Sequence, residues 1–238
     1  MGEDKISRKS KLKALTRALL KSDKLIYLES NNKWLLVASG DVKGDFKLLS
    51  RVATISFGVL LMAISSRISL ITPFSEVPFT FQTLALITLL LLLRENAWKA
   101  ISTYLMLGFA GLPLFAYGGG LQYLMSPTAG YLIGFLVSSI LGYLVGNSRS
   151  FIKFVLLSFS SLGIIYFFGW LWLTMYYTVI AGLVNVVNSM FIAFIRGVLP
   201  FVIWDVMKAL IASLISYEIY RSKNVFRLLR SLLSDFLR

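Results

Sequence analysis

Six runs of apolar residues occupy most of the chain after residue 50, and each is a candidate membrane-spanning segment. They cover residues 52–71, 81–93, 97–116, 128–146, 154–181 and 198–217. Most of these runs approach the roughly 20 residues that an α-helix needs to cross the hydrocarbon core of a bilayer. That core offers no water to backbone N–H and C=O groups, so a spanning segment satisfies them internally as a helix. Because 57% of the residues are hydrophobic and only 15% are charged, the sequence predicts an all-α integral membrane protein with six transmembrane helices.

Two shorter stretches deviate from this pattern of long helices. The second run, residues 81–93, is short, and the prolines of residues 73–78 precede it. We expect residues 73–78 either to re-enter the membrane or to pack as a cap over the second helix. Nearer the N-terminus, apolar residues 25–28 and 34–38 flank Ser30-Asn31-Asn32 and predict a small β-hairpin.

Lysine and arginine residues are distributed unevenly along the chain. If the N-terminus is cytoplasmic, twenty-one of the 24 lie in cytoplasmic segments, namely residues 1–51, 94–99, 149–153 and the stretch after Tyr220. Cytoplasmic loops next to membrane spans are enriched in these residues, so we predict that both termini are cytoplasmic and that the protein lies in the cell membrane. The same distribution accounts for the net charge of +13. It forms no basic groove interleaved with aromatic residues, so nucleic acid is not an expected partner.

Three regions follow from this topology: a basic cytoplasmic N-terminal extension of residues 1–50, a six-helix membrane domain of residues 51–220, and a basic cytoplasmic C-terminal tail of residues 221–238. Residues 5–24 hold eight Lys or Arg residues, with leucines at helical spacing. This segment predicts either a helix on the anionic lipids of the inner leaflet or a solvated basic tail. The C-terminal tail allows the same interpretation.

Asp205 and Lys208 lie inside the last apolar run. The only other charged side chain between residues 154 and 217 is Arg196. Each charge costs about 3 kcal/mol or more in a membrane helix, so a partner and a task are expected for both. Three residues turn a helix by about 300°, so the two side chains share a face that would suit a ligand with a polar head and an anionic tail. The alternative is that the two charges only neutralise each other.

The predicted topology places this charged pair in the outer half of the membrane. The last helix would run from outside to inside, with Pro200 in its first turn, where a missing N–H costs little. Two loops rich in Pro or Gly, residues 67–83 and 111–131, lie on the same outer side. The three glycines at 118–120 permit close approach of the backbone, either to a ligand or within a flexible surface turn.

The composition also limits the chemistry that the chain can perform. It contains no His and no Cys, which excludes His-based catalytic triads, thiol nucleophiles and the common zinc sites. A membrane-embedded hydrolase or transferase would need a second acid or a nucleophile near Asp205, and the predicted spans contain no paired carboxylate. No ATP-binding loop is present, so an ATP-driven step would belong to a partner. The residues favour a recognition protein without a cofactor, with a membrane-embedded enzyme as the alternative.

Four sequence blocks resemble a known family. They are VPFTFQT at 77–83, GLPLFAYGGG at 111–120, SPTAGYLIGF at 126–135 and GVLPFVIWDVMKAL at 197–210. In this order and spacing they resemble the BioY family, the biotin-specific substrate-binding (S) components of energy-coupling factor (ECF) transporters. The resemblance implies an ECF S-component-like membrane protein that takes up biotin and works with a transmembrane coupling protein and two cytoplasmic ATPases. An S component or facilitator for another small vitamin-like compound would keep the same architecture.

The chain departs from the family pattern in places. The usual Gly-Pro-Thr-Gly-Gly-Tyr becomes SPTAGY at 126–131, and Pro-Gly-Asp becomes Ile203-Trp204-Asp205, which adds a bulky ring beside the acid. S components commonly carry an Ala-xxx-Ala surface on the first helix for the coupling protein, whereas this chain offers looser pairs such as Thr54 with Gly58. Docking to a shared energising module is therefore less strongly implied than biotin binding.

The resemblance also implies a set of site residues. Asp205 and Lys208 align with the family's Asp-x-x-Lys, which contacts the vitamin. By matching charges, we expect Asp205 to accept from the ureido N–H groups and Lys208 to pair with the valerate carboxylate. Aromatic, neutral polar and backbone contacts are expected from Phe79, Tyr131, Trp204, Gln82, Gln122, Thr128, Gly119 and Gly120.

Overall fold

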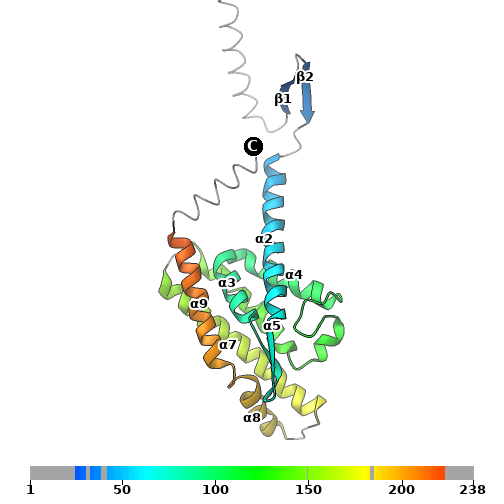
Figure 1. Ribbon diagram of the computed structural model, residues 1–238, viewed down its shortest axis with the longest axis vertical. Coiled ribbons are helices and arrows are strands. Elements are labelled where there is room, and N and C mark those ends of the chain that lie inside the picture. Colours follow the sequence, from blue (N-terminus) through cyan, green and yellow to red (C-terminus); the bar gives the residue numbers. More distant parts are fainter. Residues whose placement is uncertain (1–24, 31–32, 39–41, 149, 183–184, 223–238) are drawn as a thin grey trace, which may run out of the picture. The chain divides into compact units, whose positions relative to one another are not determined.

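The computed structural model describes residues 25–30, 33–38, 42–148, 150–182 and 185–222, with side chains from residue 48 onward (Figure 1). The chain divides into two compact units, Met1–Ala53 and Thr54–Arg238. The predicted membrane-surface segment at 5–24 and the C-terminal tail beyond residue 222 lie outside the described residues. Their association with anionic lipids remains a prediction.

The first unit contains the predicted N-terminal hairpin. Strands β1 (Leu25–Ser30) and β2 (Lys33–Ala38) pair antiparallel, with Leu25 opposite Ala38 and Ser30 opposite Lys33. This confirms the hairpin expected around residues 30–32. Helix α2 (Val42–Arg67) follows it, and the boundary between the two units falls within this helix.

In the second unit, each of the six predicted apolar runs is helical over most of its length. Besides α2, the helices are α3 (Gln82–Leu93), α4 (Ala97–Phe109), α5 (Ala129–Ser139), α6 (Gly142–Val145), α7 (Phe151–Met175), α8 (Val186–Gly197) and α9 (Val202–Arg221). The short helical turns η1 (Arg94–Asn96) and η2 (Leu121–Met125) and the π-helical turn η3 (Tyr176–Ile180) complete them. Helix α7 packs against α5, α8 and α9, and α9 also packs against α3 (Figure 1).

The helices differ in how far they could extend across a bilayer. Within the described residues, Leu48–Arg67 and Phe151–Ile180 are each long and apolar enough to cross, and α8 with α9, bent by 51°, forms a third candidate. Helix α3 has only 12 residues, yet Leu86, Leu90 and Leu91 on it are fully buried. A short helix is tolerated at membrane depth when protein rather than lipid surrounds it.

Helix α8 lies in a stretch for which the sequence analysis predicted no helix. The Asn185 side chain caps its first turn, accepting from the backbone N–H of Val187 at 2.9 Å and of Asn188 at 3.4 Å. Pro200 follows its end and separates it from α9, because a proline disfavours helical geometry in the residue before it. The bend between α8 and α9 therefore has a local cause in the sequence.

Residues 69–80, which include the predicted re-entrant or capping stretch at 73–78, form a second hairpin. Strands β3 (Ser69–Thr72) and β4 (Ser75–Thr80) pair antiparallel, with Ser69 opposite Thr80 and an irregular register between Leu70 and Thr72. The β4 strand packs against α8 and leads directly into α3. The fold is thus mostly helical, with two hairpins.

The connecting segments between the helices lie at two ends of the second unit, as the contacts among them show. At one end, Arg94 bonds to Tyr220 at 3.0 Å and to Asn147 at 3.4 Å. At the other end, Glu76 of β4 bonds to Arg196 of α8 at 2.6 Å. The connecting segments therefore fall into the same two groups that the distribution of Lys and Arg assigned to the cytoplasmic side and to the outer side. Which end faces the cytoplasm stays a prediction.

Gly58 lies where α2 passes close to α4. A Cβ atom at this position would lie 2.6 Å from the Cβ of Ala100. Gly58 therefore packs against α4 inside the protein, and its surface is not available to an outside partner.

We expect Gly58→Ala to lower the thermal unfolding temperature of the purified protein, since overpacking costs about 1–3 kcal/mol. The control is Gly163→Ala on α7, where no atom of another helix lies within 4 Å of the added Cβ. Equal unfolding temperatures for the two variants would contradict this close packing.

Candidate functional site

The charged side chains of α9 form a buried ion pair. The Lys208 Nζ atom lies 2.8 Å from the Asp205 Oδ1 atom, and the exposed fractions of the two side chains are 7% and 9%. The i, i+3 spacing places both side chains on one helix face, as the sequence predicts. The two charges therefore neutralise each other in part, which is the alternative that the sequence left open.

Neighbouring elements supply further partners for both charges. The Tyr166 hydroxyl on α7 donates to the second carboxylate oxygen of Asp205 at 2.7 Å. Lys208 donates to the backbone carbonyl of Thr80 at 2.8 Å, and its ammonium lies 3.8 Å from the centre of the Phe79 ring. Burial of a charge is tolerated only with such partners, and an ammonium over an aromatic face gains a further electrostatic attraction. The ion pair is thus one part of a larger polar cluster.

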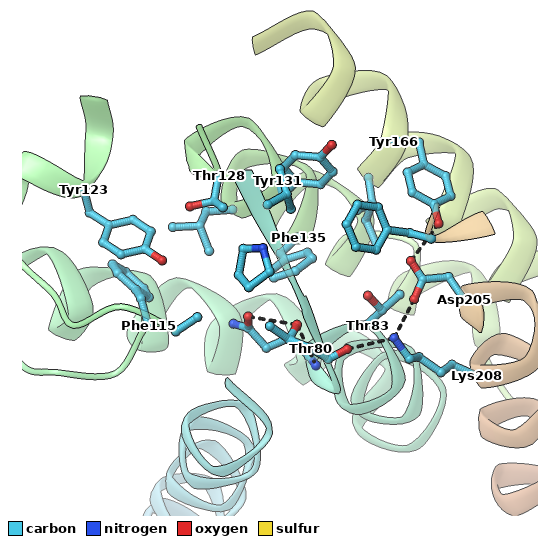
Figure 2. A pocket seen from close by; sticks show the side chains of 17 residues that line it. Thr80, Thr83, Phe115, Tyr123, Thr128, Tyr131, Phe135, Tyr166, Asp205 and Lys208 are labelled. Atoms are coloured by element: carbon cyan, nitrogen blue, oxygen red, sulfur yellow. Dashed lines mark hydrogen bonds and ion pairs between the residues drawn. The ribbon is translucent and has the colours of Figure 1, made fainter. Parts of the chain in front are cut away.

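This cluster forms one end of a pocket between β4, α3, the α4–α5 connection, α5, α7 and α9. The pocket is lined by Val77, Pro78, Thr80, Gln82, Thr83, Phe115, Ala116, Tyr123, Thr128, Tyr131, Leu132, Phe135, Ile165, Tyr166, Phe201, Asp205 and Lys208. Figure 2 shows Tyr166, Asp205 and Lys208 together at one end and Tyr123, Phe115 and Thr128 at the other. Phe135 lies between them. The pocket therefore has two polar ends separated by apolar side chains.

Gln82 is held in a chain of hydrogen bonds along the pocket wall. Its Nε2 atom donates to the Tyr104 hydroxyl at 2.8 Å, which in turn donates to the Leu114 carbonyl at 3.0 Å. Its Oε1 atom accepts from the Thr80 hydroxyl at 3.2 Å. With both ends of the amide bonded, the orientation of the Gln82 side chain is defined by its surroundings.

The pocket gathers only part of the predicted site. Asp205, Lys208, Tyr131, Gln82 and Thr128 line it. The Tyr131 ring faces the pocket while its hydroxyl donates to the Gly197 carbonyl at 2.7 Å. Whether these side chains contact a ligand remains a prediction.

The other predicted residues lie outside the lining. The Phe79 ring lies beneath the Lys208 ammonium, and its centre is 6.0 Å from the ring centre of Trp204, which is 55% exposed. The glycine loop packs on itself, because a Cβ on Gly119 would lie 2.0 Å from the Leu112 carbonyl oxygen. Gln122 donates to the Gly119 carbonyl at 2.7 Å and is otherwise at the surface. The close approach permitted by these glycines therefore serves the fold of the loop that carries Phe115.

Sequence reasoning missed several lining residues, of which Tyr166 is the most informative. A tyrosine in an apolar membrane run carries a hydroxyl that needs a partner, and this signal was present in the sequence. Nothing local connected Tyr166 to Asp205, which is 39 positions away. Tyr123, Phe115, Phe135 and Thr83 carry no comparable signal and enter the lining only through the fold.

An ion pair connects the β3–β4 hairpin to α8, close to the pocket. Glu76 accepts from Arg196 of α8 at 2.6 Å and from the Tyr177 hydroxyl. Burial opposes ionisation of Glu76, but hydrogen bonds from Tyr177, the backbone and Arg196 outweigh it and lower the pKa of this carboxyl below 4.5. Because the same hairpin lines the pocket, this contact helps to hold one pocket wall in place.

The fold and the pocket define a class of protein: a mostly helical, multi-pass membrane protein with a buried polar site. A sequence model of the BioY family matches residues 37–224. The chain belongs to the BioY family.

Known proteins support this assignment. The chain is 33% identical to "Biotin transporter BioY" of Thermotoga maritima, over 62% of this chain and 83% of that protein. It is 32% identical to "Probable biotin transporter BioY" of Pyrococcus horikoshii, over 69% of this chain and 93% of that protein. A crystal structure of the S-component for biotin from an ECF-type ABC transporter matches with a TM-score of 0.60 and 18% identity, over 78% of this chain and 96% of that one. The predicted six-helix S-component-like fold is confirmed.

We expect Tyr166→Phe to destabilise the protein, because it leaves one oxygen of the buried Asp205 carboxylate without its donor. The cost should be about 1–3 kcal/mol in the free energy of unfolding. Thermal unfolding in detergent measures it. The control is Tyr143→Phe, which removes a hydroxyl that accepts from Trp98 at the surface. A Tyr166→Phe variant as stable as this control would show that the hydroxyl contributes nothing to the cluster.

The lowered pKa of Glu76 predicts how hairpin stability depends on pH. A carboxyl whose pKa is lower in the folded protein stabilises it above its ordinary pKa, and the effect is lost as pH falls through the lowered value. We expect hydrogen exchange of residues 69–80 to be slower in the parent than in Glu76→Gln at about pH 7, with the difference shrinking as the pH falls below the ordinary glutamate pKa of about 4.3. The effect should be at most about 1 kcal/mol, since the pair is partly exposed. A difference between the two proteins that stays constant with pH would contradict it.

Proposed function

We propose that this chain is the biotin-binding S component of an ECF-type transporter and that the pocket between α3, α5, α7 and α9 receives the vitamin. Membership of the BioY family and the similarity to biotin transporters support the ligand. The observation that carries the site is the buried Asp205–Lys208 pair at one end of the pocket. Such groups inside a membrane domain are retained for a function. The chain acts in transport and not as an enzyme.

We further propose that both charges contact the ureido group. The sequence-based assignment gave Asp205 the ureido group and Lys208 the carboxylate, but an extended biotin holds these groups at opposite ends. Asp205 and Lys208 are only 2.8 Å apart at one end of the pocket. A ureido group presents N–H donors beside a carbonyl acceptor, so a carboxylate and an ammonium side by side complement it.

The rest of the ligand would then extend along the pocket. The thiophane ring and the methylene groups of the valerate chain are apolar and would pack against Phe135, Leu132 and Ile165, which line the pocket. The valerate carboxylate would reach the opposite end, where Tyr123 and Thr128 offer hydroxyl groups (Figure 2). Hydroxyl donors to an ionised carboxylate form charge-assisted hydrogen bonds.

In this arrangement the charged pair would determine which ligands the pocket accepts. Asp205, Lys208, Tyr166 and Thr80 bond to one another in this structure. A ligand that enters must replace some of these hydrogen bonds with its own. A compound without adjacent donor and acceptor groups would separate the two charges and leave them unpaired, which is strongly unfavourable in a buried site. We therefore expect the pair to discriminate among ligands more than it raises affinity.

Binding of labelled biotin to the purified protein in detergent tests the proposal. We expect the double variant Asp205→Asn, Lys208→Ala to bind biotin about 10- to 100-fold more weakly, because hydrogen bonds to charged groups contribute roughly 1.5–3 kcal/mol. Changing both residues together avoids an unpaired buried charge, which would unfold the protein for a trivial reason.

The same helix offers a matched control. Glu218 and Arg221 have the same i, i+3 spacing, lie 3.9 Å apart and are 55% and 69% exposed. The double variant Glu218→Gln, Arg221→Ala should bind biotin like the parent. Parent-like binding by the Asp205, Lys208 variant would refute the site. Displacement of labelled biotin by another vitamin at lower concentrations than unlabelled biotin requires would assign the pocket to that vitamin.

Transport itself would require partners. We propose a transmembrane coupling protein and ATPase subunits, consistent with the ECF-type S component to which the fold is similar. The orientation predicted from Lys and Arg would open the Asp205 end of α9 to the outside and direct the Arg94 end to the cytoplasm. Binding of biotin would then precede an ATP-driven step that belongs to the partners.

A further inference from the structure

A second cavity lies at the end of the membrane domain opposite the hairpin. It is formed where the α3–α4 turn meets α6 and the segment after it, and its lining includes Arg94, Glu95, Asn96, Tyr143 and Asn147. Polar side chains predominate in this lining. Nothing in the proposed biotin site uses these residues.

The backbone of Arg94 is held in an unusual conformation. Its φ angle of 54° is the only positive value for a non-glycine residue in the part of the chain that the structure describes. A side chain at positive φ costs of order 1 kcal/mol or more and persists where the surroundings enforce it. The turn between α3 and α4 therefore presents this arginine in a defined position.

The guanidinium of Arg94 is oriented by neutral groups. It stacks over the Tyr220 ring at 4.5 Å, its Nε atom donates to the Tyr220 hydroxyl at 3.0 Å, and one terminal nitrogen donates to Asn147 at 3.4 Å. No carboxylate among the described residues pairs with Arg94 within 4.0 Å. Its position is thus defined while its charge is left without a counter-ion.

Two further cations lie nearby with the same kind of partners. Lys99 donates to the Asn96 side chain at 3.0 Å, and Lys153 donates to the Val145 carbonyl at 3.3 Å. Glu95 also lines the cavity, but it is exposed and belongs to no ion pair among the described residues. Among the described residues of the α3–α4 turn and of the first turns of α4 and α7, there are three cations and one anion, so the cavity would attract a negative group.

We propose that this cavity binds the phosphate of an anionic phospholipid headgroup. A guanidinium matches the geometry of a phosphate and can donate two parallel hydrogen bonds to it. Arg94 would supply this contact, with Asn147 and Asn96 as neutral donors.

The rim of the cavity favours a lipid over an acidic protein segment. Trp98 donates to the Tyr143 hydroxyl at 2.7 Å, and such aromatic side chains concentrate at the headgroup level of membranes. Tyr143 is 53% exposed, and beside it Leu144 and Ile140 are 58% and 53% exposed. An acyl chain attached to the bound phosphate could cover this apolar surface.

Native mass spectrometry of the purified full chain with phosphatidylglycerol or phosphatidylcholine of identical acyl chains tests the proposal. We expect the parent to retain phosphatidylglycerol preferentially and Arg94→Gln to reduce this binding about 10-fold, the lower end of the loss expected for a hydrogen bond to a charged group. The control is Arg221→Gln, which changes an exposed arginine next to Tyr220 at the end of α9. This variant should bind the lipids like the parent. Thermal unfolding verifies that Arg94→Gln is folded.

Several results would overturn the lipid site. One is equal retention of the two lipids by the parent, a comparison that needs no variant and holds even if Arg94→Gln does not fold. Another is unchanged phosphatidylglycerol binding by a folded Arg94→Gln. If inorganic phosphate binds as tightly as the lipid, the cavity is a general phosphate site and not a lipid site. Arg94-dependent binding of an acidic partner peptide, without lipid preference, would assign it to a protein contact. None of these outcomes depends on whether the chain binds biotin.

Discussion

A carboxylate and an ammonium inside a membrane domain require partners, and the rest of the pocket is arranged around this requirement. Asp205 and Lys208 bond to each other, but each needs more than one neighbour to replace water. Tyr166 of α7 and the Thr80 carbonyl of β4 supply these bonds. One polar cluster therefore joins three elements that are distant in the sequence, and it defines both the position of the hairpin and one end of the pocket.

The irregular segments contribute as much to the pocket as the long helices. The β3–β4 hairpin provides a wall, and its Glu76 is fastened to Arg196 of α8. The break at Pro200 begins α9 at a new angle, bent by 51° from α8. This break places Asp205 in the first turn of α9, next to the hairpin and not in mid-helix. A continuous straight helix would separate the pair from these neighbours.

Much of the fold could be predicted because its signals are local. Apolar runs identified the helical segments, and turn residues between short apolar runs identified the N-terminal hairpin. Helix α8 was missed, since its 12 residues lie in a connection with no membrane-length run. For the glycines of the α4–α5 connection the sequence left ligand contact and a surface turn open, and in the fold Gly119 packs against the Leu112 carbonyl. Sequence alone shows that a backbone can approach something closely, but not what it approaches.

Local sequence signals suffice for the class of the protein, the segments that become helices and the face shared by Asp205 and Lys208, because hydropathy and helical periodicity act over a few residues. The groups that complete the site depend instead on tertiary packing. Tyr166 lies 39 positions from Asp205, and Thr80 lies 128 positions from Lys208. Contacts over such separations depend on how the helices pack. The same packing placed both charges at one end of the pocket, which changes the part of a ligand that they can recognise.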